Sequence, residues 1–451
     1  MGYPYLPLTC SEREKMLSAI GVGSIDELFA DIPREILLQK DLDLPEALSE
    51  SELLTHVKEL ANRNMSLENH PSFLGAGIYQ HLVPTAVHHV ANRAEFVTAY
   101  TPYQAEISQG VLQAVFEYQT LICQLTDMDV ANASLYDGAT GLAEAALMAV
   151  SVTGGNRVVT FGSLHPDYRT VVETYLKAID AELIVIPTKN GLADLAALEP
   201  LLGTETAAVL VQQPNFFGLL ESVGEIGALV QGTSTLLVAC VNPISLGILQ
   251  PPAAYGADIV VGDGQPLGNP LAFGGPSFGF MATRDKYIRR MPGRIVGQTK
   301  DEEGNRGFVL TLQTREQHIR RHRATSNICT NAAHSALIGA IYLAMLGKAG
   351  LVDVATQCAQ KAHYTAEQIC SIPGWDMLFD GPFFHEFAVK APIPSSEVNA
   401  ALRKEGIIGG LPLSRMYPER KDWENAMLFC VTEARTAREI EHLLQVLREV
   451  K

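Results

Sequence analysis

The chain has little positive charge, no long apolar run and no closely paired cysteines. Its 451 residues carry 34 Lys and Arg against 50 Asp and Glu, for a formal net charge of −16. Nucleic-acid binding needs concentrated basic side chains, so this balance argues against a nucleic-acid partner. No run reaches the roughly 18 apolar residues that a membrane span requires. We expect no membrane partner, and we expect the longest run, 336–346, to form a buried helix.

Cysteine usage and the first residues both favour a cytoplasmic protein. The seven cysteines are scattered along the chain, and no Cys-x-x-Cys pair occurs. This pattern favours reduced thiols over a disulfide framework or a zinc site, and no His, Asp or Glu spacing indicates another metal. The first ten residues lack the basic start and the apolar core of a secretory signal. We therefore expect a cytoplasmic location and no bound metal.

Short runs rich in Val, Leu and Ile alternate with helical patterns in the middle of the chain. The sequence predicts the following strands and helices: strands at 157–161, 182–187, 207–212 and 235–241, and helices at 109–126 and 167–179. Such alternation is typical of an α/β architecture, a parallel sheet covered by helices on both faces. A polar, basic region at 291–323 interrupts this pattern. Beyond it we predict a helix at 332–346, strands at 386–389 and 427–432, and a closing helix at 437–450.

These patterns divide the chain into three parts. We predict an N-terminal helical arm and lead-in at 1–94, a large α/β domain at 95–330, and a small C-terminal α+β domain at 331–451. Three Ser–Glu pairs in the arm have the spacing of a helix capping box: Ser11 with Glu14, Ser24 with Glu27, and Ser49 with Glu52. The sequence leaves open whether this arm wraps a neighbouring subunit or packs on its own core.

The segment 257–281, ADIVVGDGQPLGNPLAFGGPSFGFM, reads as a strand, a short turn and a glycine-rich stretch. In enzymes of the aminotransferase-like fold such a segment carries the lysine that binds pyridoxal phosphate (PLP). Here Gln265 and Pro266 stand near that place, and neither side chain can form a Schiff base with an aldehyde. Asn242 follows the strand at 235–241, where these enzymes usually have an aspartate that pairs with the pyridine nitrogen. The sequence therefore predicts a chain that binds no PLP covalently and works with a partner.

Three further segments each have a functional and a structural interpretation. Gly138–Gly141 precedes a helix, where free N–H groups favour an anion such as phosphate, or it is a turn capped by Thr140. The segment 96–104 lines a polar pocket or an interface, or it is a surface turn. The segment 315–327 contains four arginines. In the functional interpretation they bind a carboxylate or phosphate, and in the structural interpretation they form a solvated helix face.

Longer motifs together carry a family resemblance. They are SFLGAGIY at 72–79, AYTPYQAEISQG at 99–110, FEYQTLICQLTDMDVANASLYDGATGLAEA at 116–145, FGGPSFGFMA at 273–282, MPGRIVG at 291–297 and REQHIRRHRATSNICT at 315–330. These motifs resemble the P-protein of the glycine cleavage system, subunit 1 of its two-subunit form, over nearly the whole chain. The resemblance implies the type I fold of PLP-dependent transferases, a three-layer sheet domain followed by a smaller α+β domain.

The resemblance also implies a reaction and partners. With a PLP-bearing subunit 2, this chain would decarboxylate glycine and pass the aminomethyl group to the lipoyl arm of H-protein, and PLP would be held mainly by subunit 2 at the shared interface. The motif positions carried over as contributors to that interface active site are Tyr100, Thr101, Tyr103 and Gln104. Those carried over as candidates for the substrate or lipoyl site are Arg323, Ser326 and Asn327.

Two departures from the family pattern bear on these assignments. His322 and Arg323 stand where the family often has Glu-Lys, and Asn242 replaces an acid often seen in this subunit type. Two other classes of function stay open on the sequence. One is a catalytically inert scaffold subunit with the fold of a PLP enzyme. The other is a self-sufficient PLP lyase or transferase that uses Lys286 or Lys300.

Overall fold

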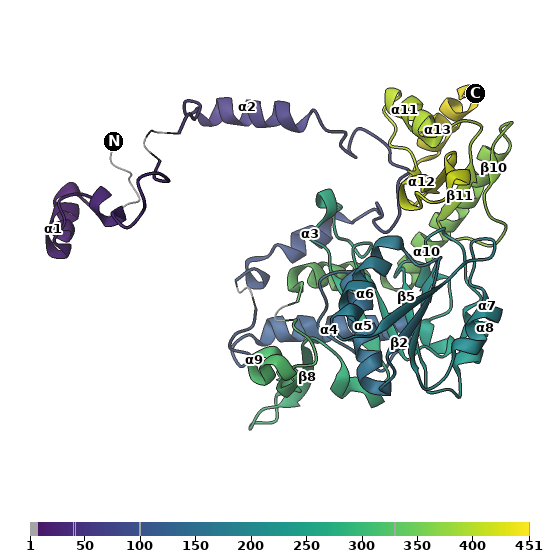
Figure 1. The fold of residues 1–451 in the computed structure, drawn as a ribbon, viewed down its shortest axis with the longest axis horizontal. Helices are drawn as coiled ribbons and strands as arrows, with labels where there is room; N and C mark the ends of the chain where they lie inside the picture. Colours follow the sequence, from purple (N-terminus) through teal and green to yellow (C-terminus); the bar gives the residue numbers. More distant parts are fainter. Residues whose placement is uncertain (1–7, 39, 41, 99–100, 329–330, 451) are drawn as a thin grey trace. The chain divides into compact units, whose positions relative to one another are not determined.

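The computed structural model describes residues 8–38, 40, 42–98, 101–328 and 331–450 (Figure 1). The chain divides into two compact units, 1–64 and 65–451. The first unit contains α1 (Cys10–Ile20), the short 3₁₀ helix η1 (Asp26–Phe29) and α2 (Glu50–Ala61), and none of these elements has a buried residue. These helices therefore have no hydrophobic core of their own. The predicted division at about residues 95 and 331 stays a prediction.

Helix capping in the first unit agrees with the sequence at one of three positions. Ser49 and Glu52 form the predicted capping box at the start of α2. The predicted capping box at α1 is wrong by two residues, because the cap is Thr9 and not Ser11. The Thr9 hydroxyl accepts the Glu12 N–H at 3.3 Å, and the Glu12 carboxylate accepts the Thr9 N–H. The box at Ser24–Glu27 is also wrong. The Glu27 carboxylate accepts the N–H of Gly23 at 3.2 Å, and η1 has no side-chain cap.

A seven-stranded sheet forms the centre of the second unit. Its strands, in spatial order, are β1 (Val130–Ala131), β7 (Gly279–Thr283), β6 (Ile259–Asp263), β5 (Leu236–Val241), β4 (Thr206–Gln213), β2 (Arg157–Phe161) and β3 (Glu182–Ile186). The strands from β6 to β3 run parallel, as predicted, whereas β7 pairs antiparallel with both β6 and β1. The carboxyl ends of the parallel strands therefore share one edge, where ligands bind in folds of this kind.

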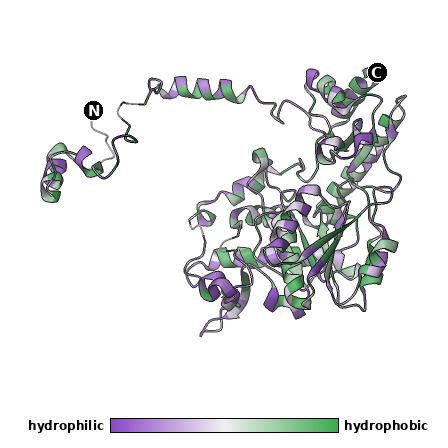
Figure 2. Ribbon diagram, viewed as in Figure 1, coloured by the Kyte–Doolittle hydropathy of each residue, from purple (hydrophilic) through white to green (hydrophobic). Residues whose placement is uncertain are grey.

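Helices cover both faces of this sheet and make three layers. Side chains alternate along each strand: Leu237 and Val241 of β5 pack into the cluster that contains α4 (Gln109–Thr126), α8 (Val223–Val230) and α10 (Ala333–Cys370). Leu236 and Val238 pack instead into the cluster that contains α5 (Gly138–Thr153) and α6 (Pro166–Lys177). Because both faces are covered, the strands are almost continuously apolar, and Figure 2 shows hydrophobic residues concentrated at the sheet.

The helix α10 connects the two sheets of the second unit. It contains the predicted buried run 336–346 and packs against α4 and α3 (Thr85–Ala91). The predicted helix end at 346 is confirmed, because Gly347, with φ 58°, lies outside helical geometry, and a second helical stretch of α10 continues from there to Cys370. Among the described helices α10 is also the one that is long and apolar enough to span a membrane, and 44% of that apolar window is buried inside the protein. Core helices of this length pass the same test.

A four-stranded sheet follows α10. Its strands, in spatial order, are β10 (Asp376–Met377), β11 (Glu386–Lys390), β13 (Ala426–Cys430) and β12 (Leu411–Pro412). The helices α11 (Ser395–Lys404) and α13 (Ala437–Glu449) pack with it around a core that includes Phe387 and Phe429. The predicted smaller α+β unit, with strands at 386–389 and 427–432 and a final helix, is therefore present.

The basic region 291–323 contains a hairpin that the sequence did not predict. Its strands are β8 (Ile295–Lys300) and β9 (Arg306–Thr311), followed by the short helix α9 (Gln317–Arg320) (Figure 1). Only alternate residues such as Val296 and Phe308 face α4, so no apolar run marks these strands. The Gln119 side chain of α4 holds the Val296 backbone with two hydrogen bonds of 2.9 Å.

Candidate active site

The residue near the expected lysine position is fully engaged in hydrogen bonds. Gln265 follows β6 and is only 4% exposed. Its Oε1 accepts the Tyr79 N–H at 2.9 Å, and its Nε2 donates to the carbonyl oxygens of Tyr79 at 3.0 Å and Asn269 at 3.0 Å. The side chain thus holds two distant segments of backbone together. No amine is available here to condense with an aldehyde.

Carboxylates close the place where a phosphate would bind. The N-terminus of α5 begins at Gly138, and its N–H donates to Asp263 Oδ2 at 3.0 Å. The N-cap Asp137 accepts the Thr140 N–H at 2.7 Å, and the Thr140 hydroxyl accepts the Asp137 N–H at 3.3 Å. Of the two interpretations of Gly138–Gly141, the capped turn is the one present, with Asp137 as the cap and Thr140 as its partner. A phosphate would meet negative charge where it needs free donors.

The position expected to pair with a pyridine nitrogen carries no charge. Asn242 donates through Nδ2 to Nε2 of His385 at 3.3 Å, and its Oδ1 accepts the Ile244 N–H at 2.9 Å. Burial, together with the nearby His81, lowers the pKa of His385 to about 3, so its imidazole is neutral. A neutral amide next to a neutral imidazole supplies no anion to a pyridine ring.

A cavity of about 280 Å³ remains at this edge of the sheet, beside a smaller one of about 30 Å³. Both are lined by Gly77, His165, Tyr168 and Asp263. His165 donates through Nε2 to the Ala76 carbonyl at 3.0 Å and accepts the Asp167 N–H on Nδ1 at 3.1 Å, and burial lowers its pKa. Without an amine, an open phosphate cradle or an acid at the pyridine position, the residues of this chain do not fit PLP. We call this space the vacated pocket.

A second cavity, of about 440 Å³, lies where three of the sequence motifs meet, those at 99–110, 116–145 and 273–282. We call it the motif cavity, and its polar lining residues are Thr101, Asn331, His334 and Ser335. Arg294 Nη1 donates to Thr101 Oγ1, and Arg294 Nε lies 3.6 Å from Glu316 Oε2. Asn331 Nδ2 donates to Ser134 Oγ at 3.0 Å and to the Ala133 carbonyl at 3.1 Å. These contacts join segments that lie far apart in the chain.

The structure separates the predicted residues of the segment 96–104. Thr101 is 5% exposed and lines the motif cavity. Tyr103 is 80% exposed, and Gln104 is exposed beside it, so both face away from this chain's interior. Tyr100 lies outside the described residues. The segment therefore offers one internal hydroxyl and an exposed aromatic ring with an exposed amide.

The candidates from the segment 315–327 are also not brought together. Arg323, in the 3₁₀ helix η9 (Arg321–Arg323), and Asn327 are exposed. Ser326 donates its hydroxyl to Glu144 Oε1 of α5 at 2.8 Å, and burial raises the pKa of Glu144 to about 7. The Ser326 hydroxyl is thus already hydrogen-bonded to a buried carboxyl of this chain. Of the four arginines, Arg315 has a structural role, because it donates to the carbonyl groups of residues 291 and 293.

Sequence reasoning missed several residues of this region. Arg294 lies in the motif MPGRIVG, and Asn331 comes directly after ATSNICT, but no local pattern shows that they converge on Thr101 and Ser134. The alternative lysines lie elsewhere. Lys286 Nζ is 3.5 Å from Asp258 Oδ1 with a side chain 64% exposed, and Lys300 is exposed at the end of β8. Neither lines the vacated pocket or the motif cavity.

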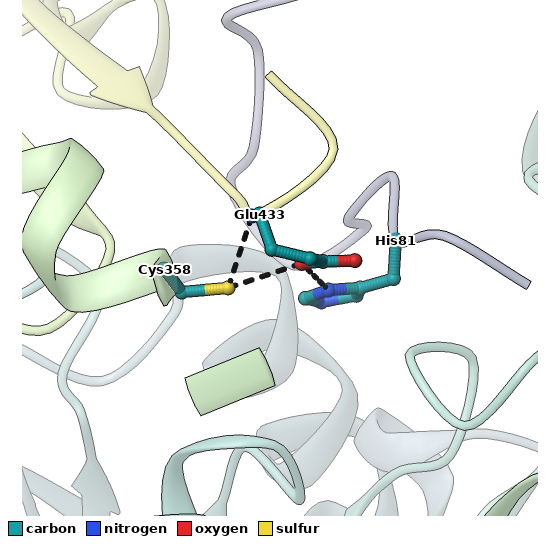
Figure 3. A group of neighbouring side chains, drawn as sticks. All are labelled: His81, Cys358 and Glu433. Atoms are coloured by element: carbon teal, nitrogen blue, oxygen red, sulfur yellow. Dashed lines mark hydrogen bonds and ion pairs between the residues drawn. The ribbon is translucent and has the colours of Figure 1, made fainter. Parts of the chain in front are cut away.

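His81, Cys358 and Glu433 form a further cluster (Figure 3). Glu433 Oε2 accepts from His81 Nδ1 at 2.7 Å and from the Cys358 thiol at 3.1 Å, while Oε1 accepts the Leu82 N–H at 2.6 Å. Burial alone would raise the pKa of Glu433, but the hydrogen bond and charge interaction with His81, together with the hydrogen bonds from the Leu82 N–H and the Cys358 thiol, outweigh burial and lower this pKa to about 2. One oxygen serves both side chains, so the cluster ties the segment before α3 to α10 and to the loop after β13.

Comparisons with known proteins agree with this geometry. The family model described as "Glycine cleavage system P-protein" matches residues 3–447. A "Probable glycine dehydrogenase (decarboxylating) subunit 1" of Desulfitobacterium hafniense is 53% identical over 447 residues, which cover 99% of this chain and 100% of the relative. A crystal structure of an inhibitor-bound glycine decarboxylase (P-protein) of the glycine cleavage system is 46% identical and covers 100% of both chains with a TM-score of 0.89.

A more distant match shows the fold alone. A C-DES mutant with glycine covalently linked to its PLP cofactor is 16% identical, with a TM-score of 0.62, over 85% of this chain and 97% of that one. The architecture is therefore that of PLP-dependent enzymes of the aminotransferase-like type I fold, as the motifs implied.

Proposed function

This chain belongs to the P-protein family of the glycine cleavage system, as a subunit 1 of glycine dehydrogenase (decarboxylating), and from this premise we propose how it takes part in the reaction. Its activity is that of one half of a two-subunit enzyme. We infer that PLP is carried by subunit 2 and that this chain completes the active site from across their interface. The substrate is glycine, and the acceptor is the lipoyl arm of H-protein. We place the complex in the cytoplasm.

The single observation that carries this proposal is Gln265. The side chain is buried and makes three hydrogen bonds to backbone groups in a place where the fold needs a free amine. The carboxylates at the start of α5 support the same conclusion, because they take the N–H groups that would bind phosphate. PLP supplies the electron sink that decarboxylation of an amino acid requires, so a second chain must provide it.

This chain's own contribution is positioning at the interface. Arg294 fixes the Thr101 hydroxyl at the motif cavity, next to the exposed Tyr103 and Gln104. Tyr100 belongs to the same motif. We propose that these four motif residues, Tyr100, Thr101, Tyr103 and Gln104, contribute to the active site at the interface with the partner. Arg323 and Asn327 are exposed and available to a carboxylate or to the lipoyl arm, with Ser326 beside them fixed by Glu144.

Reconstitution tests the proposal. The chain alone, subunit 2 alone and their mixture are each supplied with PLP, glycine and lipoylated H-protein, and release of carbon dioxide from the glycine carboxyl is measured. We expect release from the mixture and none from this chain alone. Turnover of glycine by this chain in the absence of subunit 2 would refute the proposal, and a mixture that assembles without turnover would refute it as well.

A scaffold without a catalytic contribution is the second candidate. The observation that favours it is the closure of the phosphate position at the start of α5 by Asp263, together with the hydrogen bond that the Ser326 hydroxyl makes to Glu144. Substituting Tyr103→Ala in the assembled complex separates the two functions, because Tyr103 is 80% exposed and its loss does not disturb this chain's core. A fall in turnover with assembly intact indicates an active-site contribution. Unchanged turnover, with Tyr100→Ala and Gln104→Ala equally silent, indicates a scaffold.

A further inference from the structure

Phe273 is the most exposed large hydrophobic side chain among the described residues. Its relative exposure is 101%, against 80% for Tyr103 and 77% for Ile107, the next two. Covering an aromatic ring buries about 150–250 Å² and dominates the energetics of many interfaces. A single exposed ring is nevertheless ordinary on a protein surface. The ring becomes informative through the backbone that carries it.

That backbone lies in a sparsely populated conformation over four consecutive residues. From Ala272 to Gly275 the φ angles are 41°, 54°, 106° and 157°, and two of these residues are not glycine. A residue with a side chain is destabilised in the left-handed region and persists there only where the surrounding structure imposes it. Such residues concentrate at functional sites. The loop 271–277 is therefore held in a conformation that presents its tip to the outside.

The residues that replaced the cofactor machinery hold the base of this loop. Gln265 Nε2 donates to the Asn269 carbonyl at 3.0 Å, and Asn269 Nδ2 donates to the Ser335 carbonyl at 3.1 Å. At the other end, the Ser277 hydroxyl donates to Asp263 Oδ1 at 2.6 Å. Gln265 stands near the lysine position, and Asp263 closes the phosphate position. Both side chains thus have a structural task at the loop.

The loop also lies between the two cavities of the candidate site. Leu271, Gly274 and Gly275 line the vacated pocket, and so does Ile78, which is 42% exposed. Pro276 lines both the vacated pocket and the motif cavity that contains Thr101. The exposed ring therefore adjoins the surface that faces the second subunit in the proposed function.

We propose that Phe273 is an apolar anchor that inserts into a recess of subunit 2, with Gln265 and Asp263 as the positioning residues of its loop. This inference rests on the proposed function, because it takes its partner from that complex. It gives a physical reason for the strained loop, since binding covers a ring that folding leaves in water.

The first test measures association of the full chain with subunit 2. Phe273→Ala is compared with the control variant Ile179→Ala. Ile179 follows α6, at the sheet edge opposite the loop, and its side chain is 45% exposed. Truncating an interface anchor weakens binding by about 10- to 100-fold. We expect Kd to rise by a factor in that range for Phe273→Ala and to change less than twofold for Ile179→Ala. Equal affinity of Phe273→Ala and the unaltered chain overturns the proposal, even if turnover falls.

A second variant keeps the proposal testable if Phe273→Ala folds poorly. Phe273→Trp keeps an aromatic ring and adds a fluorophore, while the natural Trp375 and Trp423 are buried, at 1% and 5% exposed. We expect its emission to shift to shorter wavelength when subunit 2 is added. An emission that stays at the wavelength of a solvated indole in the complex overturns the proposal. The proposal is also overturned if the shift occurs without subunit 2 and sedimentation shows that the isolated chain associates with itself.

A third measurement tests the positioning residues. In the Phe273→Trp background, Gln265→Met removes the hydrogen bond to Asn269 and keeps the volume of the side chain. We expect lower fluorescence anisotropy of the loop in the free chain, and unchanged anisotropy overturns the positioning role. Failure of the anchor is distinguishable from failure of the function. If the unaltered mixture releases carbon dioxide and Phe273→Ala binds normally, only the anchor is wrong.

Discussion

Restoring a lysine at Gln265 should not restore a cofactor site. The substitution Gln265→Lys supplies an amine, but it removes the Oε1 that accepts the Tyr79 N–H at 2.9 Å. Tyr79 is 8% exposed, so its N–H is left buried without an acceptor. An unsatisfied buried donor costs about 1–3 kcal/mol. We expect the free energy of unfolding to fall by that amount, measured by urea denaturation.

The same variant should fail to bind PLP. Asp137 and Asp263 still occupy the N–H groups at the start of α5, and Asn242 still offers no charge to the pyridine. After incubation with PLP and reduction with borohydride, mass spectrometry should find no more adduct than with Gln298→Lys, an exposed control on β8. A stoichiometric adduct on Gln265→Lys alone would refute the reasoning. So would full stability, because the lost hydrogen bond would then have no consequence.

Three further predictions concern other parts of the chain. Thr101→Val removes the acceptor for Arg294, and turnover of the complex should fall roughly tenfold with unchanged assembly, because the motif cavity loses its fixed hydroxyl; normal turnover would contradict this. Burial raises the pKa of Glu386 from 4.5 to about 7, so the folded chain binds this proton more tightly than the unfolded chain does. The resulting contribution to the free energy of unfolding is complete below pH 4.5 and is lost as pH rises through 7. That loss is on the order of 3 kcal/mol, and urea unfolding across this range should be flatter with pH for Glu386→Gln than for the unaltered chain. Glu433→Gln weakens the charged bond to His81 and should lower the unfolding free energy by about 2 kcal/mol; no change would mean that the cluster does not tie its segments together.

The helices and strands of the large sheet were predictable because their burial is continuous. The helix 109–126 and the strand 157–161 have the predicted bounds, since each is an apolar or amphipathic run that ends at turn residues. The hairpin of β8 and β9 was not predictable, because only alternate residues face α4. The helix end at 346 was predictable, because Gly347 and Lys348 follow the apolar run, whereas the sequence did not predict that a second helical stretch continues to Cys370.

In the candidate site, features that depend on a single position were predictable, and features that depend on contacts between distant residues were not. The missing amine at Gln265 and the missing acid at Asn242 follow from single positions in recognisable segments, so the sequence revealed both. The sequence did not reveal that Asp263 occupies the Gly138 N–H at the start of α5, because these two residues are 125 positions apart and meet only in the folded chain. Likewise, the hydrogen bond between Ser326 and Glu144 joins residues that are 182 positions apart, so the sequence did not reveal it, and the site role of Ser326 stays a prediction.

The central claim is that the aldehyde cofactor is attached to the other subunit. The most direct measurement reduces the reconstituted, glycine-active complex with borohydride and maps the pyridoxyl group by peptide mass spectrometry. The account predicts the label on one lysine of subunit 2 and none on this chain. A pyridoxyl group on any lysine of this chain, Lys286 and Lys300 included, would contradict it.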